Sequence, residues 1–249
     1  MSNSTHQKVA LITGGGTGAG RAAALRFASK GIAVVVNYSR SAKEAEETAS
    51  QARQAGVPSF ACQANVADDQ AVRKMVARCR EELGGLDILV NNAGTTHFVD
   101  YANLDGITDE VWDDILNVNL KGTFYCSRAA MPLLKERKGA IVNITSVAGL
   151  MGQGSSIPYA ASKGALNTMT MSFAKAFGPE VRVNAVAPGP ILTRWLEGRE
   201  GMVENYLQLT PMKRASLPED VADAVEFLAT GTSLITGQIV VVDGGRTMR

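Results

Sequence analysis

The chain has 249 residues, of which 45% are hydrophobic, and its 25 Lys and Arg nearly balance its 24 Asp and Glu. A chain without a basic excess is not expected to bind nucleic acid. Its two histidines and three cysteines share no metal-ligand or redox spacing, so we expect neither a metal site nor a disulfide framework. No apolar run approaches the roughly 18 residues of a membrane span, and the N-terminus lacks an apolar signal core. We therefore expect a soluble, cytoplasmic protein that does not insert into membranes.

Short apolar runs alternate along the chain with longer segments of helical period. Runs that are apolar on both faces imply buried parallel strands, and right-handed crossovers between them produce a doubly wound sheet. The sequence predicts an α/β fold in which residues 1–249 form a single domain. The predicted strands are 9–12, 33–36, 59–62, 87–90, 140–144, 181–186 and 238–242, and the predicted helices are 19–30, 42–55, 69–83, 109–135, 156–177 and 218–229.

One long stretch, 187–217, lies outside this alternation, just before the last predicted helix. Loops longer than about 12–15 residues are usually functional, and open α/β sheets bind ligands at the carboxyl ends of their strands. We predict that this segment is a lid over the substrate.

The first predicted strand runs directly into a glycine-rich turn, Thr13-Gly-Gly-Gly-Thr-Gly-Ala-Gly20, and then into a helix. Glycines at 14, 18 and 20 allow a tight turn and let the backbone approach a pyrophosphate, which the helix N-terminus stabilises with free N–H groups. A plain glycine-rich turn is the alternative, but the position between the first strand and a helix favours a dinucleotide site.

An NAD site usually has Asp or Glu at the end of the second strand, where it binds the ribose hydroxyls. This chain has Asn37, Tyr38, Ser39 and Arg40 there, with no carboxylate. Ser39 and Arg40 are suited to hold a 2′-phosphate, so NADP(H) is favoured over NAD(H). The alternative is that Arg40 is a solvated charge before the next helix.

Tyr159 and Lys163 lie four residues apart in a predicted helix and therefore share a face. A nearby ammonium stabilises a phenolate and lowers the pKa of the phenol, which turns a weak acid into a useful proton donor. Ser146 ends the fifth predicted strand at the same edge of the sheet. These three residues predict a site for proton transfer to a substrate oxygen.

Together, the motifs resemble those of the short-chain dehydrogenases/reductases over essentially the whole chain. The matching motifs are Thr13-Gly-x-x-x-Gly-x-Gly20, Asn91-Asn-Ala-Gly94, Asn119 in Asn117-Val-Asn-Leu-Lys-Gly122, Ser146, Tyr159-x-x-x-Lys163, Pro188-Gly189, Thr236-Gly-Gln and Val242-Asp-Gly-Gly245. The resemblance implies a Rossmann-like sheet of seven parallel strands with helices on both faces, nicotinamide chemistry, and usually a homotetramer, with a homodimer as the alternative.

The resemblance also implies roles for individual residues. Tyr159 would exchange a proton with the substrate oxygen, and Ser146 would polarise that oxygen. Lys163 would lower the pKa of Tyr159 and bind the nicotinamide ribose, and Asn119 would hold a water in a proton relay. The implied cofactor contacts are Gly14, Gly16, Thr17, Gly18, Ala19, Gly20, Asn37, Ser39, Arg40, Asn65, Val66, Asn92, Ala93, Gly94, Tyr159, Lys163, Pro188, Gly189, Ile191 and Thr193.

Among subfamilies, the chain is most similar to 3-oxoacyl-carrier-protein reductases, but it departs from them where an acidic carrier protein would dock. The docking positions, usually basic, hold Pro132 and Lys175, and Thr17 stands where NADP-preferring relatives often have a basic residue. We therefore favour a carbonyl reductase of small or medium, fairly apolar ketones or β-keto esters. A carrier-protein reductase is the alternative, and a non-catalytic nucleotide-binding protein on the same fold is a further one, disfavoured because the four catalytic residues are retained.

The substrate pocket is expected between residues 95–98, 151–157 and 190–206. For His97 a solvated loop position is favoured over a substrate contact, because one histidine without a partner residue in the sequence carries little functional signal. Trp195 and Tyr206 either line the pocket or pack the lid onto the body. Cys126 is interpreted as a buried packing residue. The candidate substrate contacts are His97, Phe98, Met151, Ile157, Leu192 and Trp195.

Overall fold

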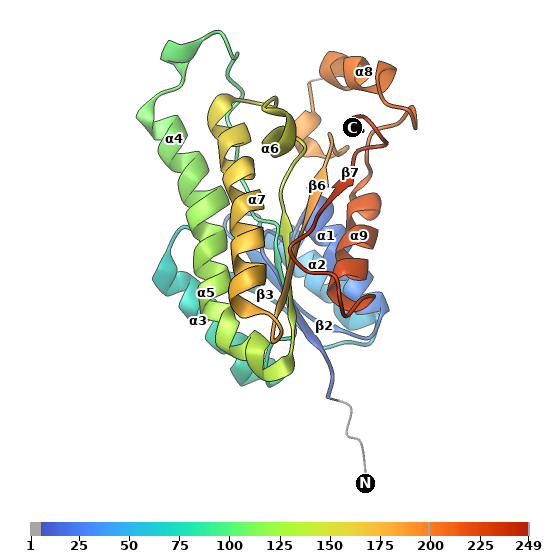
Figure 1. Ribbon diagram of the computed structural model, residues 1–249. Helices are drawn as coiled ribbons and strands as arrows, with labels where there is room; N and C mark the ends of the chain where they lie inside the picture. The colour runs from blue at the N-terminus through green and yellow to red at the C-terminus, as the bar shows by residue number, and fades with distance from the viewer. Residues whose placement is uncertain (1–5, 199, 249) are drawn as a thin grey trace.

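The computed structural model describes residues 6–198 and 200–248. The first five residues, part of the segment for which we expected no signal core, and residue 199 of the expected lid lie outside this range. The described chain forms a layered α/β structure whose lid segment lies beyond one end of the sheet (Figure 1).

Seven parallel strands form one sheet in the order β3-β2-β1-β4-β5-β6-β7, which confirms the predicted fold class. The strand order reverses between β1 and β4, the place where doubly wound sheets bind their ligands. The strands are β1 Val9–Ile12, β2 Ala33–Tyr38, β3 Ser59–Gln63, β4 Ile88–Asn91, β5 Ala140–Ile144, β6 Arg182–Pro188 and β7 Ile239–Val242.

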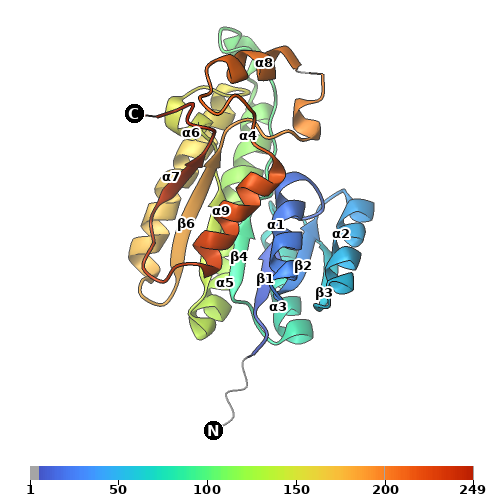
Figure 2. The same cartoon turned by 90° about the vertical axis from the view of Figure 1, so that its right-hand side faces the viewer.

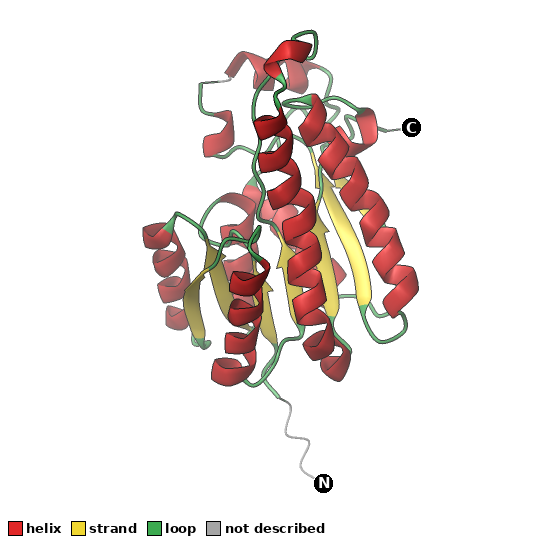
Figure 3. Cartoon of the chain, turned by 90° about the vertical axis from the view of Figure 1, so that its left-hand side faces the viewer, coloured by secondary structure: helices red, strands yellow, loops and turns green. Residues whose placement is uncertain are grey.

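Helices cover both faces of this sheet, because successive strand residues point to opposite sides and both sides are apolar. Ala10 and Ile12 of β1 pack against α1, α2 and α9 (Figure 2), whereas Val9 and Leu11 pack against α3, α5 and α7 (Figure 3). The α-helices are α1 Gly18–Ser29, α2 Ala42–Gln54, α3 Asp69–Leu83, α4 Asp109–Leu116, α5 Thr123–Arg137, α6 Ala148–Met151, α7 Ile157–Phe177, α8 Glu200–Gln208 and α9 Pro218–Thr230.

The prediction of one continuous helix over 109–135 is wrong at its centre. Helix α4 and helix α5 are separated by a π-helical segment, Asn117–Gly122, that adds a wider turn. Gly122 packs so closely on Val66 that a Cβ would have no room there. A π-segment inside a long helix is frequently found at a functional site, and periodicity alone does not reveal it.

The segment predicted as a lid, 187–217, has structure of its own. It contains a 3₁₀ turn at Arg194–Leu196 and helix α8, which lies beyond the carboxyl ends of the strands (Figures 1 and 2). Its two ends are held together because Leu192 N–H donates to the carbonyl of Ser216 at 2.9 Å. Within the described part of the chain, no helix is long and apolar enough to cross a bilayer.

Candidate active site

A cleft of about 1310 Å³ runs along the carboxyl ends of the strands, from the β1–α1 turn to the lid. It brings together residues from all parts of the chain between Gly14 and Thr247. Every predicted cofactor contact except Gly20 lines it, and so do Ser146, Tyr159 and Lys163. The tertiary structure therefore places the predicted cofactor and catalytic groups in one cavity.

The glycine-rich turn has the geometry of a pyrophosphate cradle. Gly14 and Gly18 adopt the left-handed backbone conformation, with φ of +60° and +53°, which favours glycine. Thr17, the N-cap of α1, makes no hydrogen bond from its side chain to the helix, so the first N–H groups of α1 are not capped by it. Because these donors face the cleft, they fit the pyrophosphate of a dinucleotide.

The lid closes over this turn. Thr193 lies against Gly18, where a Cβ would come within 3.2 Å of the threonine methyl. Gly20, by contrast, is not among the residues that line the cleft, and its predicted contact with the cofactor stays a prediction. It packs against the Asn92 side chain and the Gly14 carbonyl, where the bulk of a Cβ would collide. Gly20 therefore lets α1 approach the sheet.

Asn37 has a structural role at the end of β2. It is 1% exposed, its amide donates to the carbonyls of Cys62 and Ala64, and its oxygen accepts the Gly14 N–H at 3.2 Å. An amide at this position ties β2, β3 and the glycine-rich turn together. An acidic side chain could not donate these hydrogen bonds, which gives a physical reason for the missing carboxylate.

Two guanidinium groups stand at the ribose end of the cleft. Arg40 is exposed and lines the cleft. Arg194 reaches across from the lid to the start of α2, where its Nη2 donates to Ser41 Oγ at 3.3 Å and its Nη1 lies 4.0 Å from Glu44 Oε1. Sequence reasoning missed this contribution from Arg194, because 153 residues separate it from Ser41.

The proton-transfer group lies at the end of β5 and the start of α7. Tyr159 lines the cleft and is partly exposed, and its hydroxyl is hydrogen bonded to Ser146. Burial raises the pKa of Tyr159, and the Ser146 hydrogen bond opposes this rise. The hydrogen bond from Ser146 is the lowering influence on the Tyr159 pKa, and a lowering by Lys163 stays a prediction. The Lys163 amine donates to the Ile144 carbonyl at 2.9 Å.

Lys163 itself is a strongly perturbed amine. It is 4% exposed, and burial lowers its pKa to about 8. Its Nζ lies 5.7 Å from the centre of the Tyr159 ring. An amine whose pKa is close to neutrality can give up and regain a proton in the physiological range, which suits a proton relay.

Asn119 lies in the π-helical segment, and its side chain does not line the cleft. Its oxygen accepts the Thr95 N–H at 2.8 Å, and its amide donates to the Thr95 carbonyl and to Ser162 Oγ. Ser162 in turn donates to the Tyr159 carbonyl. The observed contacts make Asn119 a tether between the loop after β4 and helix α7, and its place in a water relay stays a prediction.

Four of the candidate substrate contacts line the cleft: Phe98, Met151, Leu192 and Trp195. Ile157 does not line it. Since Tyr159 faces the cleft, a residue two positions earlier on the same helix faces away from it. Trp195 thus lines the pocket.

His97 does not line the cleft either, and its exposed position in the loop after β4 agrees with the solvated loop histidine that we favoured. Its Nε2 lies 2.8 Å from Asp114 Oδ2, and this pair fixes the loop after β4 to helix α4. Asp114, which the sequence did not single out, borders the cleft and also accepts from Thr95 Oγ1.

The two roles considered for Tyr206 occur together. Tyr206 lines the cleft, and its hydroxyl packs the lid segment by donating a hydrogen bond to the Asp243 carbonyl. Cys126 is buried, and burial raises its pKa to about 12, which confirms a packing residue. Among the described residues, no group of His, Cys, Asp or Glu is arranged to hold a metal ion.

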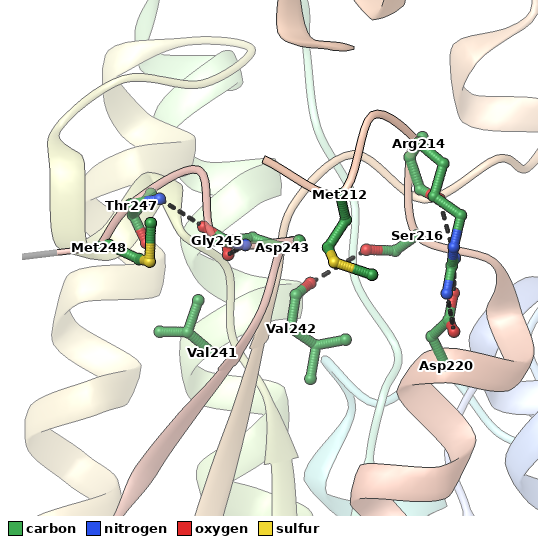
Figure 4. Close-up of a pocket in the computed structure, with 12 residues that line it drawn as sticks. Met212, Arg214, Ser216, Asp220, Val241, Val242, Asp243, Gly245, Thr247 and Met248 are labelled. Carbon is green, nitrogen blue, oxygen red and sulfur yellow. Dashed lines mark hydrogen bonds and ion pairs between the residues drawn. The ribbon is translucent and has the colours of Figure 1, made fainter. Parts of the chain in front are cut away.

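A second, smaller hollow of about 440 Å³ lies between the end of β7 and the start of α9 (Figure 4). Arg214 and Asp220 form a two-point ion pair on one side of it, and Met212 and Met248 are among its lining residues. The Asp243 carboxylate, which also lines it, accepts the N–H groups of Gly245 and Thr247.

Comparisons with known proteins agree with this geometry. Residues 14–247 match a family model described as enoyl-(acyl carrier protein) reductase. A Streptomyces violaceoruber protein, assigned as a ketoacyl reductase of the granaticin polyketide synthase, is 43% identical over 242 residues and 95% of each chain. The 3-oxoacyl-(acyl-carrier-protein) reductase FabG of Staphylococcus aureus is 40% identical over 245 residues, 97% of this chain and 98% of the relative.

A solved structure of a Burkholderia xenovorans protein, assigned to the short-chain dehydrogenases/reductases, superimposes with a TM-score of 0.92 at 36% identity and covers 100% of both chains. The chain belongs to the short-chain dehydrogenase/reductase family. It is an NAD(P)-dependent oxidoreductase that acts on a ketone or secondary alcohol.

Proposed function

We propose that this oxidoreductase is an NADPH-preferring reductase of free ketones, with Tyr159 as the proton donor. The observation that carries the proposal is the shared cleft, in which the Ser146–Tyr159 pair faces the cradle formed by the β1–α1 turn. Bound NADPH supplies the hydride. Ser146 orients the carbonyl oxygen and Tyr159 gives it a proton. We assign the resupply of that proton to a relay that includes the buried Lys163 amine, whose Nζ lies 5.7 Å from the centre of the Tyr159 ring.

The preference for the phosphorylated cofactor is supported by the charges at the ribose end. Asn37 uses its amide to hold the turn, and no acidic side chain stands at the end of β2. Arg40 and Arg194 flank the same end of the cleft. A planar guanidinium binds phosphate through paired hydrogen bonds, so this pair favours a 2′-phosphate.

The preference for free ketones is supported by the surface of α5 and α7. Pro132 lies inside α5 and offers no charge, and Lys175 is a single exposed ammonium on α7. Arg128, another cation of α5, is already paired with Asp69 at 2.7 Å. An acidic carrier helix would therefore find little complementary charge.

The test compares reduction of a free 3-oxoacyl thioester with the same acyl group on acyl carrier protein. We expect similar values of kcat/KM at low and high salt. A large preference for the carrier-bound form that salt weakens would instead establish a carrier-protein reductase. Following NADPH and NADH oxidation in parallel, with a panel of ketones, tests both the cofactor preference and the substrate class.

We also propose that residues 1–249 form one domain, with 187–217 as the lid, and that the protein assembles as a homotetramer or homodimer in the cytoplasm. Exposed apolar side chains support the assembly. Val240 and Val241 lie on β7 at the open edge of the sheet beside Phe227, and Phe124 and Met171 are exposed on α5 and α7. Light scattering of the purified protein and fractionation of cells test these two points.

A further inference from the structure

The C-terminal segment brings to the cleft a charged residue that belongs neither to the predicted cofactor contacts nor to the predicted proton-transfer group. After β7 the chain turns back, and Arg246 and Thr247 line the cleft beside Tyr206 and Leu209 of the lid region. Arg246 is only partly exposed. A guanidinium in such a place is costly unless it meets an anion or water.

No carboxylate lies within ion-pair distance of Arg246 among the residues that the structure describes. Asp243 is near in sequence, but its two carboxylate oxygens accept the N–H groups of Gly245 and Thr247 at 2.8 Å. Asp114, which also lines the cleft, is engaged by His97 and Thr95. The charge of Arg246 is thus left for a ligand.

Tyr206 fixes where this charge lies relative to the reaction centre. The Tyr206 hydroxyl and the backbone N–H of Arg246 both donate to the Asp243 carbonyl, at 3.1 and 3.4 Å, so Arg246 lies next to Tyr206. That hydroxyl packs directly on Gly189, where a Cβ would have no room. Gly189 follows β6, and the carbonyl of its neighbour Pro188 accepts from Val147, next to Ser146. Arg246 therefore lies on the β6–β7 side of the proton-transfer group.

We propose that Arg246 binds the carboxylate of the substrate, so that the preferred substrate is a ketone with an apolar body and a carboxylate at some distance from its carbonyl. The inference rests on the proposed ketone reduction and names its substrate class. The apolar body fits Phe98, Met151, Leu192 and Trp195, and the carboxylate accepts two hydrogen bonds from the guanidinium fork.

The experiment measures kcat/KM for straight-chain keto acids whose ketone lies at carbon 4, 5 or 6, each against its methyl ester. We expect the acid with the best spacing to exceed its ester by about 10-fold or more, the effect of one charge-assisted pair. In Arg246→Gln the ratio of acid to ester should fall to near one, and in Arg246→Lys it should be intermediate, because an ammonium lacks the fork.

Arg73→Gln is the matched control, since Arg73 is an exposed cation of α3 that pairs with Asp69 far from the cleft and its loss changes the net charge equally. This control should keep the ratio of the unaltered protein. A second readout avoids catalysis: calorimetric titration of hexanoate into the protein saturated with NADPH should give binding that Arg246→Gln weakens by about 10-fold.

Esters and acids reduced equally well, or a preference for acids that survives Arg246→Gln, would overturn the proposal while leaving ketone reduction intact. Failure of every ketone with both cofactors would instead overturn the proposed function. The two failures are thus distinguishable.

Discussion

Replacing Lys163 with methionine should make the protein more stable near neutral pH while it destroys activity. Lys163 is 4% exposed, and burial lowers its pKa from 10.5 to about 8. That difference corresponds to a free-energy penalty of about 3 kcal/mol for holding the ammonium inside the folded protein. Methionine has a similar length and no charge, so it removes this penalty.

The pH window follows from the direction of the shift. Below pH 8 the amine is charged in both the folded and the unfolded protein, and the whole penalty is present. Between pH 8 and 10.5 the folded protein releases its proton first, so the penalty disappears and Lys163 makes stability rise with pH. Between pH 7 and 10 this rise should amount to about 2 kcal/mol.

A second effect works against the gain. Methionine leaves the Ile144 carbonyl without the donor that Lys163 supplies at 2.9 Å, which costs about 1–3 kcal/mol. The net gain at pH 7 is therefore about 0–2 kcal/mol. The change in stability with pH is the better measure, because the lost hydrogen bond affects both pH values equally.

Chemical denaturation at pH 7 and pH 10 measures this change for the unaltered protein, Lys163→Met and Lys175→Met. Lys175 is exposed on the same helix, so its variant should follow the unaltered protein. If Lys163→Met gains as much stability between pH 7 and 10 as the unaltered protein does, the buried amine is not the perturbed group and the reasoning fails.

Three further predictions concern the cleft and the packing of α1 beside it. In Tyr159→Phe, kcat should fall by at least ~10²-fold with the dissociation constant of NADPH nearly unchanged, because the hydroxyl acts mainly in the transition state; substantial remaining turnover would contradict its assignment as proton donor. Arg40→Ala should weaken NADPH binding roughly 10- to 100-fold and NADH binding little, as measured by fluorescence titration, and equal losses would show that Arg40 does not contact the 2′-phosphate. Gly20→Ala should lower the Tm measured by calorimetry by several degrees, because overpacking against Asn92 and Gly14 costs ~1–3 kcal/mol. The control Gly201→Ala, where a Cβ meets open space, should leave Tm unchanged, and equal Tm values for the two variants would refute the packing role.

Local pattern was enough to predict the sheet, the turn and the proton-transfer group. Strands of a parallel sheet are apolar on both faces, so β1, β2, β4, β5 and β6 stand out as short apolar runs in the sequence. The turn after β1 needs glycine at Gly14 and Gly18 because their φ is positive. Tyr159 and Lys163 are separated by one helical turn, so their proximity is a local property of α7.

Features that depend on distant segments could not be found in this way. The π-helical turn at Asn117–Gly122 is stabilised by contacts of Asn119 with Thr95 and Ser162, which lie 24 and 43 residues away. Its residues have no periodicity that distinguishes them from an ordinary helix. The same holds for His97, whose partner Asp114 lies on another element.

The positions of the two arginines proposed to select the cofactor and the substrate could be found only from the tertiary structure. Arg194 meets Ser41 across the mouth of the cleft, and Arg246 reaches the cleft because the chain turns back after β7. Neither arginine lies in a sequence motif that indicates a binding site, because the residues around each one come from segments far away in the sequence. The sequence by itself was enough to predict the class of reaction, because the residues that indicate it lie close together within one helix or one turn. Which anions the cleft can hold was decided by the folding of the lid and the C-terminus onto it, because charge complementarity depends on distance in space and not on distance along the chain.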